Sequence, residues 1–263
     1  MLADIELLNK VAKEAGKIAL SFFNSKNQIW EKSGGSPVSQ ADFAVDKYLR
    51  ETLLEERPQY GWLSEETEDD KDARLSKDII FVVDPIDGTR GFLEGSDQWC
   101  VSIGIVENNL PIAGILECPV LKETYIATKN GGSFLNGKKL ILPSHNTDSK
   151  VESVTGSRIL NAELVENYKD QLTVAPYVPS LAYRIAMVAA NQVDAGVARG
   201  GAKDWDLAAA DLILSEAGGI LTDLEGEIRY YNKQSTGGGP LVAASKVRHK
   251  TILALAKSEG FLQ

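Results

Sequence analysis

Residues 79–89 read IIFVVDPIDGT, an apolar run that ends in two aspartates. Five consecutive apolar residues are typical of a strand that is buried on both faces. We expect this strand to end at Asp84, where the polar residues begin. A buried strand that ends in two charged side chains is unfavourable unless something compensates the charges. The aspartates, Asp84 and Asp87, are therefore the first candidates for function.

A divalent cation would provide that compensation. The side chains of Asp84 and Asp87 and the Ile86 carbonyl between them offer three oxygens, and oxygen ligands select hard cations such as Mg²⁺. Gly88 and Thr89 follow where a turn or helix begins, so their backbone N–H groups could hold a phosphate oxygen. The alternative interpretation is an Asx-rich turn that caps the next element.

The sequence before this stretch predicts two helices and an acidic loop. Apolar residues recur at helical spacing through residues 2–24, and residues 32–37 interrupt the pattern. Ser39 and Asp42 resemble a capping box, with Asp in place of the usual Glu, and the helix they open extends to about Glu56. A polar, acidic loop is expected over residues 65–78.

The sequence after it changes character near residues 143–150. Before that point, β-rich segments over 99–106, 113–118 and 124–128 are separated by Asn-rich and Gly-rich turns, which predicts an antiparallel meander. Beyond it, strands (151–155, 195–198, 241–244) alternate with helices (180–190, 206–217, 247–258). We expect an α+β subdomain over 1–145, carrying most of the metal ligands, and an α/β subdomain over 146–263.

Composition excludes several classes of function. The chain has 263 residues and a formal net charge of −9, which argues against a nucleic-acid binder. Its two histidines exclude a three-His zinc site and leave little for a Ser-His-Asp triad. Its two cysteines cannot form a disulfide framework, and the longest uncharged stretch, 171–183, is too short for a bilayer. We therefore expect a cytoplasmic protein with no membrane partner, whose chemistry depends on carboxylates.

Three further features are weak when taken singly. Glu65 and Glu66 are adjacent acids in an acidic loop, where such residues are usually just solvated. Asp206, after Trp205, opens an apolar helix, and an acid there is favoured by the helix dipole alone. Lys32 taken alone is a surface lysine. Their occurrence together with the aspartates favours a functional interpretation over a structural one.

Taken together, these segments resemble the inositol monophosphatase superfamily of metal-dependent, lithium-sensitive phosphatases. The first family signature is matched by DPIDGT at 84–89, and the second by WDLAAAD at 205–211 with EAGG at 216–219. The acidic pair at 65–66 and the stretch SPVSQAD at 36–42 also fit. The resemblance covers nearly the whole chain. It implies a layered αβαβα sandwich of the inositol monophosphatase and fructose-1,6-bisphosphatase type, which is commonly homodimeric.

The resemblance also implies roles for individual residues. Glu65, Asp84 and the Ile86 carbonyl would bind one Mg²⁺. Asp84, Asp87 and Asp206 would bind a second, and Glu65 would help to hold a third. The resemblance also implies which residues act on the attacking water and on the phosphate. Thr89 and Glu65 would orient and activate the water, and Asp42 would support Thr89. Gly88 and Thr89 would hold the phosphate. Glu66 and Lys32 would be supporting residues.

The substrate is less well defined by the sequence. Residues 84–95 and 63–66 are similar to the 3′(2′),5′-bisphosphate nucleotidase branch, whose members remove the 3′-phosphate of adenosine 3′,5′-bisphosphate. Arg199 stands where inositol-specific members carry an acid, and a guanidinium suits a second anionic group better than a hydroxyl. Arg90, directly after Thr89, also favours a substrate with a second anionic group. Alternatively, Arg90, Arg199 and Lys203 are surface charges paired with acids such as Glu94 or Asp204.

Two other functions stay open at this point. The substrate could be inositol 1-phosphate, or histidinol phosphate or another sugar phosphate. The chain could also be a non-catalytic interaction protein that kept the fold, although every expected ligand position carries the expected residue.

Overall fold

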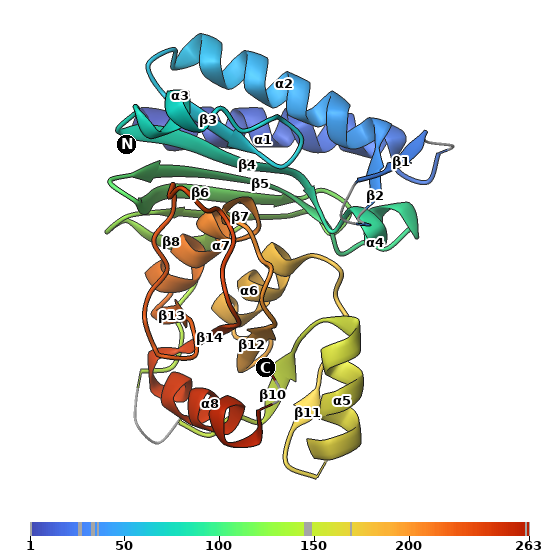
Figure 1. Cartoon of the computed structure of the whole chain (residues 1–263), viewed down its shortest axis with the longest axis vertical. Coiled ribbons are helices and arrows are strands. Elements are labelled where there is room, and N and C mark those ends of the chain that lie inside the picture. Colours follow the sequence, from blue (N-terminus) through green and yellow to red (C-terminus); the bar gives the residue numbers. More distant parts are fainter. Residues whose placement is uncertain are drawn as a thin grey trace.

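The structure is a computed structural model that describes residues 2–25, 28–32, 35, 37–144, 149–168, 170–260 and 262. Five layers are stacked in the order helices, sheet, helices, sheet, helices (Figure 1). This is the αβαβα sandwich expected from the sequence. Ser36 of the SPVSQAD stretch and the expected boundary between residues 145 and 146 lie outside the described residues. Over the described residues, no helix is both long enough and apolar enough to cross a membrane.

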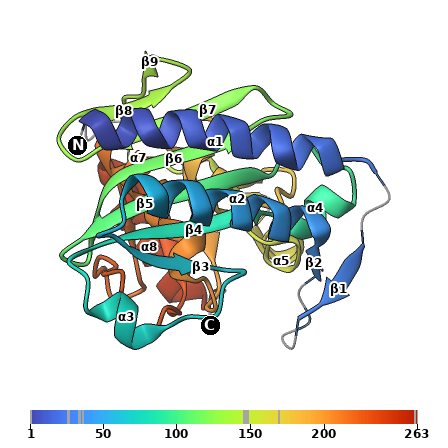
Figure 2. The same ribbon diagram turned by 90° about the horizontal axis from the view of Figure 1, so that it is seen from above.

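The first helical layer packs on a seven-stranded sheet (Figure 2). It consists of α1 (Leu2–Phe22) and α2 (Gln40–Glu56), and their apolar faces share one core with the sheet. The order of the sheet is β3 (Gly61–Ser64), β4 (Ile79–Asp87), β5 (Cys100–Glu107), β6 (Leu110–Cys118), β7 (Glu123–Thr128), β8 (Gly132–Leu135) and β9 (Lys138–Lys139). From β4 to β9 the strands are antiparallel neighbours in chain order, which confirms the predicted meander.

The central layer lies between the two sheets and consists of α6 (Leu181–Ala189) and α7 (Asp204–Glu216). Alanines 208, 209 and 210 on α7 are buried, and the Cα of Ala209 would lie 2.9 Å from a Cβ added to Gly114 of β6. Small residues on both surfaces therefore allow α7 to approach the sheet closely. This approach places the first turn of α7 beside the end of β4.

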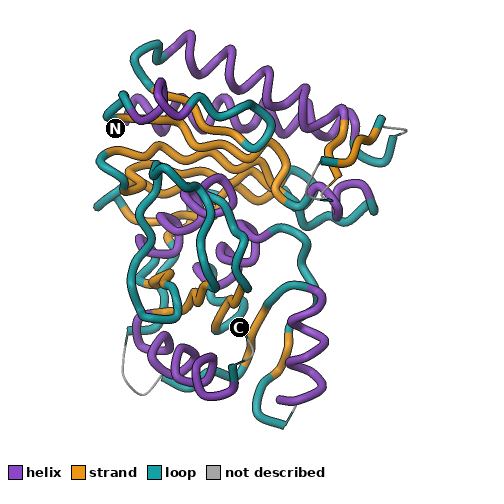
Figure 3. Tube along the Cα trace, in the orientation of Figure 1, coloured by secondary structure: helices purple, strands orange, loops and turns teal. Residues whose placement is uncertain are grey.

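The second sheet is mixed. Its order is β11 (Thr173–Val174), β10 (Ser153–Thr155), β12 (Ala195–Ala198), β14 (Leu241–Ser245) and β13 (Gly219–Thr222). The β10 strand is parallel to its neighbours, whereas β14 is antiparallel to both of its own. The last layer, α5 (Arg158–Tyr168) and α8 (Lys246–Glu259), covers its outer face (Figure 3).

Four short elements complete the fold over the described residues. The strands β1 (Ile29–Glu31) and β2 (Pro37–Ser39) form an antiparallel pair before α2. The helix α3 (Lys71–Leu75) lies in the segment expected to be only an acidic loop, and α4 (Thr89–Leu93) follows β4. The predicted capping box is confirmed, because the Ser39 side chain accepts from the Ala41 N–H and Asp42 accepts from the Ser39 N–H.

One boundary prediction is wrong, because β4 does not end at Asp84. The strand continues to Asp87, with a shift in its register against β5 between Asp84 and Asp87. Pro85 has no N–H to donate, and the irregular pairing at this point needs none from it. Both aspartates therefore belong to the irregular end of the strand.

Candidate active site

Three aspartates, two buried and one half-buried, meet at the end of β4. Asp84 and Asp87 are among the last four residues of that strand, and Asp206 lies in the first turn of α7. One carboxylate oxygen from each lies within 4.8 Å of the oxygens of the other two. Residues that are 119 positions apart, from Asp87 to Asp206, thus form one cluster because α7 packs on the sheet. We name Asp84, Asp87 and Asp206 the aspartate cluster.

A backbone N–H group donates to each carboxylate of the cluster, and Asp87 also accepts from a hydroxyl. Asp87 accepts from the Ser180 hydroxyl and from the Ala182 N–H at 2.6 Å, so it caps the start of α6. Asp206 accepts from the Lys203 N–H at 2.7 Å, and Asp84 accepts from the Ile86 N–H at 3.0 Å. Each side chain is therefore held by an element end rather than by a flexible loop.

The cluster is electrostatically strained without a cation. Burial, and then the negative charges of Glu65, Asp87 and Asp206, raise the pKa of Asp84 well above its usual value. Burial and the charge of Asp87 do the same to the pKa of Asp206. Burial raises the pKa of Asp87 to about 6, although its hydrogen bonds from α6 oppose the shift. An all-oxygen donor set with uncompensated negative charge fits a hard divalent cation.

A threonine hydroxyl stands next to the cluster. The Thr89 hydroxyl oxygen lies 3.1 Å from an Asp42 carboxylate oxygen and 3.0 Å from the Ile86 carbonyl oxygen. Asp42 also accepts from the backbone N–H and the hydroxyl of Ser39. Burial raises the pKa of the Asp42 carboxyl. Asp42, a member of the α2 capping box, therefore also positions Thr89.

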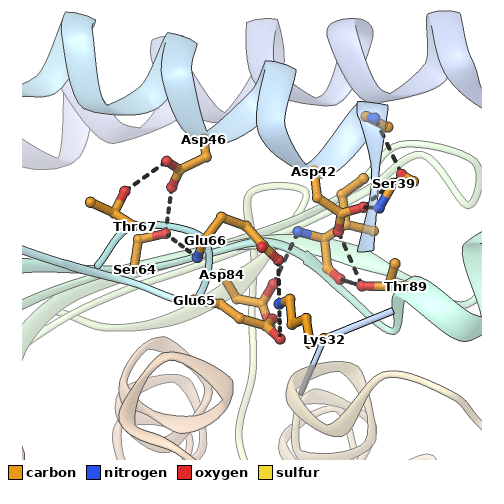
Figure 4. Close-up of polar contacts among 12 residues, drawn as sticks. Lys32, Ser39, Asp42, Asp46, Ser64, Glu65, Glu66, Thr67, Asp84 and Thr89 are labelled. Carbon is orange, nitrogen blue, oxygen red and sulfur yellow. Dashed lines mark hydrogen bonds and ion pairs between the residues drawn. The ribbon is translucent and has the colours of Figure 1, made fainter. Parts of the chain in front are cut away.

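The acidic pair, Glu65 and Glu66, is held by a lysine rather than joined to the aspartates. The Lys32 ammonium lies 2.7 Å from a carboxylate oxygen of Glu65 and 2.7 Å from one of Glu66 (Figure 4). Burial lowers the pKa of Lys32, but these two carboxylates outweigh it and the net shift is upward. Burial raises the pKa of Glu66 to about 7. We name Lys32, Glu65 and Glu66 the glutamate clamp.

Two glycines, Gly88 and Gly91, allow close packing between the starts of α4 and α6. Gly88 has a φ of 94°, which favours glycine, and a Cβ there would lie 3.0 Å from the Ser180 nitrogen. A Cβ on Gly91 would lie 2.3 Å from a Pro179 side-chain carbon. The start of α4 is thus packed directly against the start of α6, with no room for a methyl group.

The structure gives the predicted substrate-binding arginines different surroundings. Arg90 is exposed on α4. Arg199 directly follows β12 and contacts both carboxylate oxygens of Glu163 on α5. Its partner is therefore neither Glu94 nor Asp204, the acids considered from sequence; Glu94 pairs with Arg158 and Asp204 with Arg229.

Reasoning from the sequence missed two residues that position the site. Ser180 donates to Asp87, and Asp46 of α2 accepts from the hydroxyls beside the acidic pair. Ser180 was taken as the first residue of the predicted helix 180–190, and it could have been recognised as the N-cap, since serine is preferred at that position. Asp46 carries no such signal, because an acid one turn after Asp42 resembles any polar helix position.

A family model described as the inositol monophosphatase family matches residues 3–260. An inositol-1-monophosphatase from Rhizobium meliloti is 31% identical over 261 residues, which cover 96% of this chain and 93% of the relative. A 3′(2′),5′-bisphosphate nucleotidase, CysQ, from Haemophilus influenzae is 30% identical over 242 residues, 88% of this chain and 89% of the relative. The solved structure of the extragenic suppressor protein suhB from Bartonella henselae superposes with a TM-score of 0.83 at 25% identity, covering 97% of this chain and 98% of that one.

Proposed function

The chain belongs to the inositol monophosphatase family, and from this premise we propose that it is a Mg²⁺-dependent hydrolase of phosphate monoesters. The observation that carries the proposal is the convergence of Asp84, Asp87 and Asp206 beside the Asp42–Thr89 pair. Such a cluster can hold cations, and the adjacent hydroxyl can orient a water molecule toward the substrate.

In this proposal, five groups hold two or three Mg²⁺ ions: the side chains of Glu65, Asp84, Asp87 and Asp206 and the Ile86 carbonyl. Asp84 belongs to both ligand sets that the resemblance implies, so it would help to hold two of the ions. When bound, the ions lower the pKa of the attacking water and neutralise the charge on the leaving oxygen. For Glu65 to take part, its carboxylate must turn away from Lys32, which holds it in the structure.

The protein groups around the ions supply orientation. Asp42 accepts the Thr89 hydroxyl hydrogen, so the lone pairs of that oxygen are available to accept a hydrogen from the attacking water. Glu65 would accept another hydrogen from the same water. The N–H groups of Gly88 and Thr89 would hold the phosphate, with Asp87 and Asp206 lining the site. Such positioning provides most of the catalysis of phosphoryl transfer.

For the substrate, we favour adenosine 3′,5′-bisphosphate, with hydrolysis at the 3′-phosphate. The sequence similarity at 84–95 and 63–66 and the CysQ relative support it. Arg199 would meet the second phosphate after leaving Glu163, and exposed Arg90 would add positive charge. The alternative is inositol 1-phosphate, which is favoured by the relative from Rhizobium meliloti.

The experiment compares phosphate release from adenosine 3′,5′-bisphosphate, inositol 1-phosphate and histidinol phosphate at equal concentration, with Mg²⁺ and with EDTA. We expect Mg²⁺-dependent release, fastest from the nucleotide. Arg199→Glu should lower kcat/KM for the nucleotide about tenfold, equivalent to about 1.4 kcal/mol, and should change inositol 1-phosphate hydrolysis little. Lys250→Glu, on the exposed side of α8, is the matched charge reversal.

Each outcome decides a different part of the proposal. No release from any ester by folded protein would contradict the phosphatase and favour a non-catalytic interaction protein. Faster release from inositol 1-phosphate would replace the nucleotide assignment. We further propose a lithium-sensitive, cytoplasmic homodimer; light scattering coupled to size-exclusion chromatography tests its oligomeric state.

A further inference from the structure

Helix α2 carries two buried carboxylates one turn apart, Asp42 and Asp46. Asp42 positions Thr89 through the contact between its carboxylate and the threonine hydroxyl. We propose that Asp46 is a positioning residue, which fixes the segment carrying Glu65 so that this side chain can join the metal site. The inference rests on the proposed phosphatase function, because it assigns Glu65 as a metal ligand.

Asp46 anchors the acidic pair from both sides. One of its carboxylate oxygens accepts the Ser64 hydroxyl, and the other accepts the Thr67 hydroxyl at 2.8 Å (Figure 4). Ser64 directly precedes Glu65, and Thr67 directly follows Glu66. A single side chain therefore holds both ends of the two-residue acidic segment.

The anchors are themselves buried and connected. Asp46 is 8% exposed and Ser64 is 2% exposed, so these hydrogen bonds are largely protected from water. The Thr67 hydroxyl also accepts from the Trp62 indole N–H at 3.3 Å, and the Ser64 hydroxyl accepts from the Glu66 N–H at 3.4 Å. Hydrogen bonds in such a buried network strengthen one another, and losing its shared acceptor leaves two hydroxyls unpaired.

The backbone of Glu65 is fixed on its other side as well. Its N–H donates to the Val83 carbonyl at 3.2 Å, which continues the β3–β4 pairing one residue beyond β3. Val83 immediately precedes Asp84, so the backbone of Glu65 lies beside the aspartate cluster although its carboxylate lies on Lys32. We therefore infer that Glu65 joins the site through its side chain, while its backbone stays paired with Val83. Asp46 keeps the backbone in the place from which the side chain joins the site.

A purely structural role makes a different prediction. If Asp46 only joins α2 to β3, its replacement lowers stability but leaves the affinity of the folded protein for Mg²⁺ unchanged. If it positions Glu65, the affinity falls even in folded protein, because Glu65 reaches the ion from a less ordered segment. Loss of a residue that orients a metal ligand typically costs about 10- to 100-fold in metal affinity.

The test uses Asp46→Asn, which keeps the size of the side chain but replaces one of the two acceptor oxygens by an NH₂ group and removes the charge. Isothermal titration with Mg²⁺ should show an apparent Kd raised about tenfold, and the Mg²⁺ concentration needed for half-maximal phosphate release should rise in parallel. At saturating Mg²⁺, kcat should recover to within about threefold, because the groups that touch substrate are unchanged.

Ser64→Ala and Thr67→Val each remove one anchor and should each give part of this effect. They also carry the test if Asp46→Asn does not fold. The matched control is Glu117→Gln on β6, where a buried carboxylate accepts a single hydroxyl, that of Thr124, at 2.7 Å. This control should lower the melting temperature without changing the Mg²⁺ titration.

An unchanged Mg²⁺ Kd in folded Asp46→Asn, or in both single-anchor variants, would overturn the inference. Failure of the wild-type protein to bind Mg²⁺ or release phosphate would instead contradict the proposed function. The two failures are therefore distinguishable, since the first is seen only in the variants.

Discussion

The aspartate cluster and the glutamate clamp place the same chemical groups in two different electrostatic situations. Asp84, Asp87 and Asp206 face one another with hydrogen bonds from backbone N–H groups and Ser180. Burial raises the pKa of all three carboxyls, and the charges of neighbouring carboxylates add to the shift at Asp84 and Asp206. Glu65 and Glu66 share the ammonium of Lys32 at 2.7 Å. In the proposed site, the aspartate cluster would therefore take an added cation, whereas the glutamate clamp already has one in Lys32.

The two groups also differ in what holds them. The aspartate cluster is built from element ends, namely the end of β4 and the first turn of α7, with hydrogen bonds from the start of α6. In the glutamate clamp, the proposed site would require Glu65 to exchange Lys32 for an ion. Preorganised acids and one movable ligand together give a site that can bind cations with little reorganisation.

Asp84→Asn should have the largest effect on activity, because it removes a proposed oxygen ligand from the aspartate cluster. We expect phosphate release to fall at least about 10³-fold, as loss of several kcal/mol of charge stabilisation implies. The metal-free melting temperature should not fall, since the substitution removes a buried charge that its neighbours disfavour. Phosphate release and thermal unfolding in EDTA measure the two effects.

The control for this variant is Asp78→Asn, an exposed aspartate just before the other end of β4. It should leave both measurements unchanged. A wild-type rate in Asp84→Asn would refute the bridging role of Asp84 and remove the distinction between the two groups of acids.

Lys32→Met should have the next largest effect, and it acts on the glutamate clamp alone. Glu66, whose side chain is 3% exposed, loses its counter-charge, and removing one partner of a buried pair costs about 3–5 kcal/mol. Partial exposure of Lys32 and Glu65 reduces this cost, so we expect the metal-free melting temperature to fall by about 5 °C. Mg²⁺ should restore more stability in this variant than in the wild type.

Two comparisons sharpen that result. Lys17→Met breaks the exposed pair with Glu14 and should change the melting temperature by less than about 1 °C. Adding Glu66→Gln to Lys32→Met should recover most of the lost stability. If Lys32→Met is as stable as the wild type in EDTA, the clamp does not compensate the glutamates.

The dependence of stability on pH should be the smallest effect. The pKa of Asp87 is raised to about 6 and that of Glu66 to about 7, so the folded protein holds protons that the unfolded chain has released. The metal-free stability contributed by these groups is therefore greatest near pH 4 and falls as pH rises to about 7. Bound Mg²⁺ favours the ionised aspartates, so its stabilising effect should grow over the same range.

Melting temperatures measured from about pH 5 to about pH 8, with Mg²⁺ and with EDTA, check this sign. Glu66→Gln should flatten part of the metal-free slope while leaving the Mg²⁺ effect in place, because Glu66 is not among the proposed ligands. A Mg²⁺ effect that shrinks as pH rises would contradict the assignment of ionised carboxylates to the ions.

Individual strands and helices around the site were largely predictable, because they depend on local patterns, whereas the layered arrangement and the grouping of the carboxylates were implied by the resemblance. The apolar run at 79–83 predicted a buried strand, and Ser39 with Asp42 predicted the start of α2. The extension of β4 through Pro85 was not predictable, because it depends on a register shift against β5, a strand that comes later in the chain. The resemblance to a family named the carboxylates, but it could not show that the Lys32 ammonium lies 2.7 Å from Glu65.

The surroundings of Arg199 show the limit of local reasoning most clearly. Its position suggested a guanidinium that meets a second anionic group of the substrate, or a surface charge paired with Glu94 or Asp204. Its partner, Glu163, lies on α5, a helix whose weak apolar periodicity gave no prediction. An interaction across 36 residues between an unpredicted helix and a strand end cannot be read from spacing.

The close contact of Gly88 with Ser180, and of Gly91 with Pro179, has a mechanical consequence. A methyl group on either glycine would strike the segment that leads into α6, so the starts of α4 and α6 fit together only with glycine at 88 and 91. Asp87 accepts from the Ala182 N–H beside this contact, so loosening the contact would also disturb a carboxylate of the proposed metal site. We therefore expect the starts of α4 and α6 to stay packed together while ligands enter and leave.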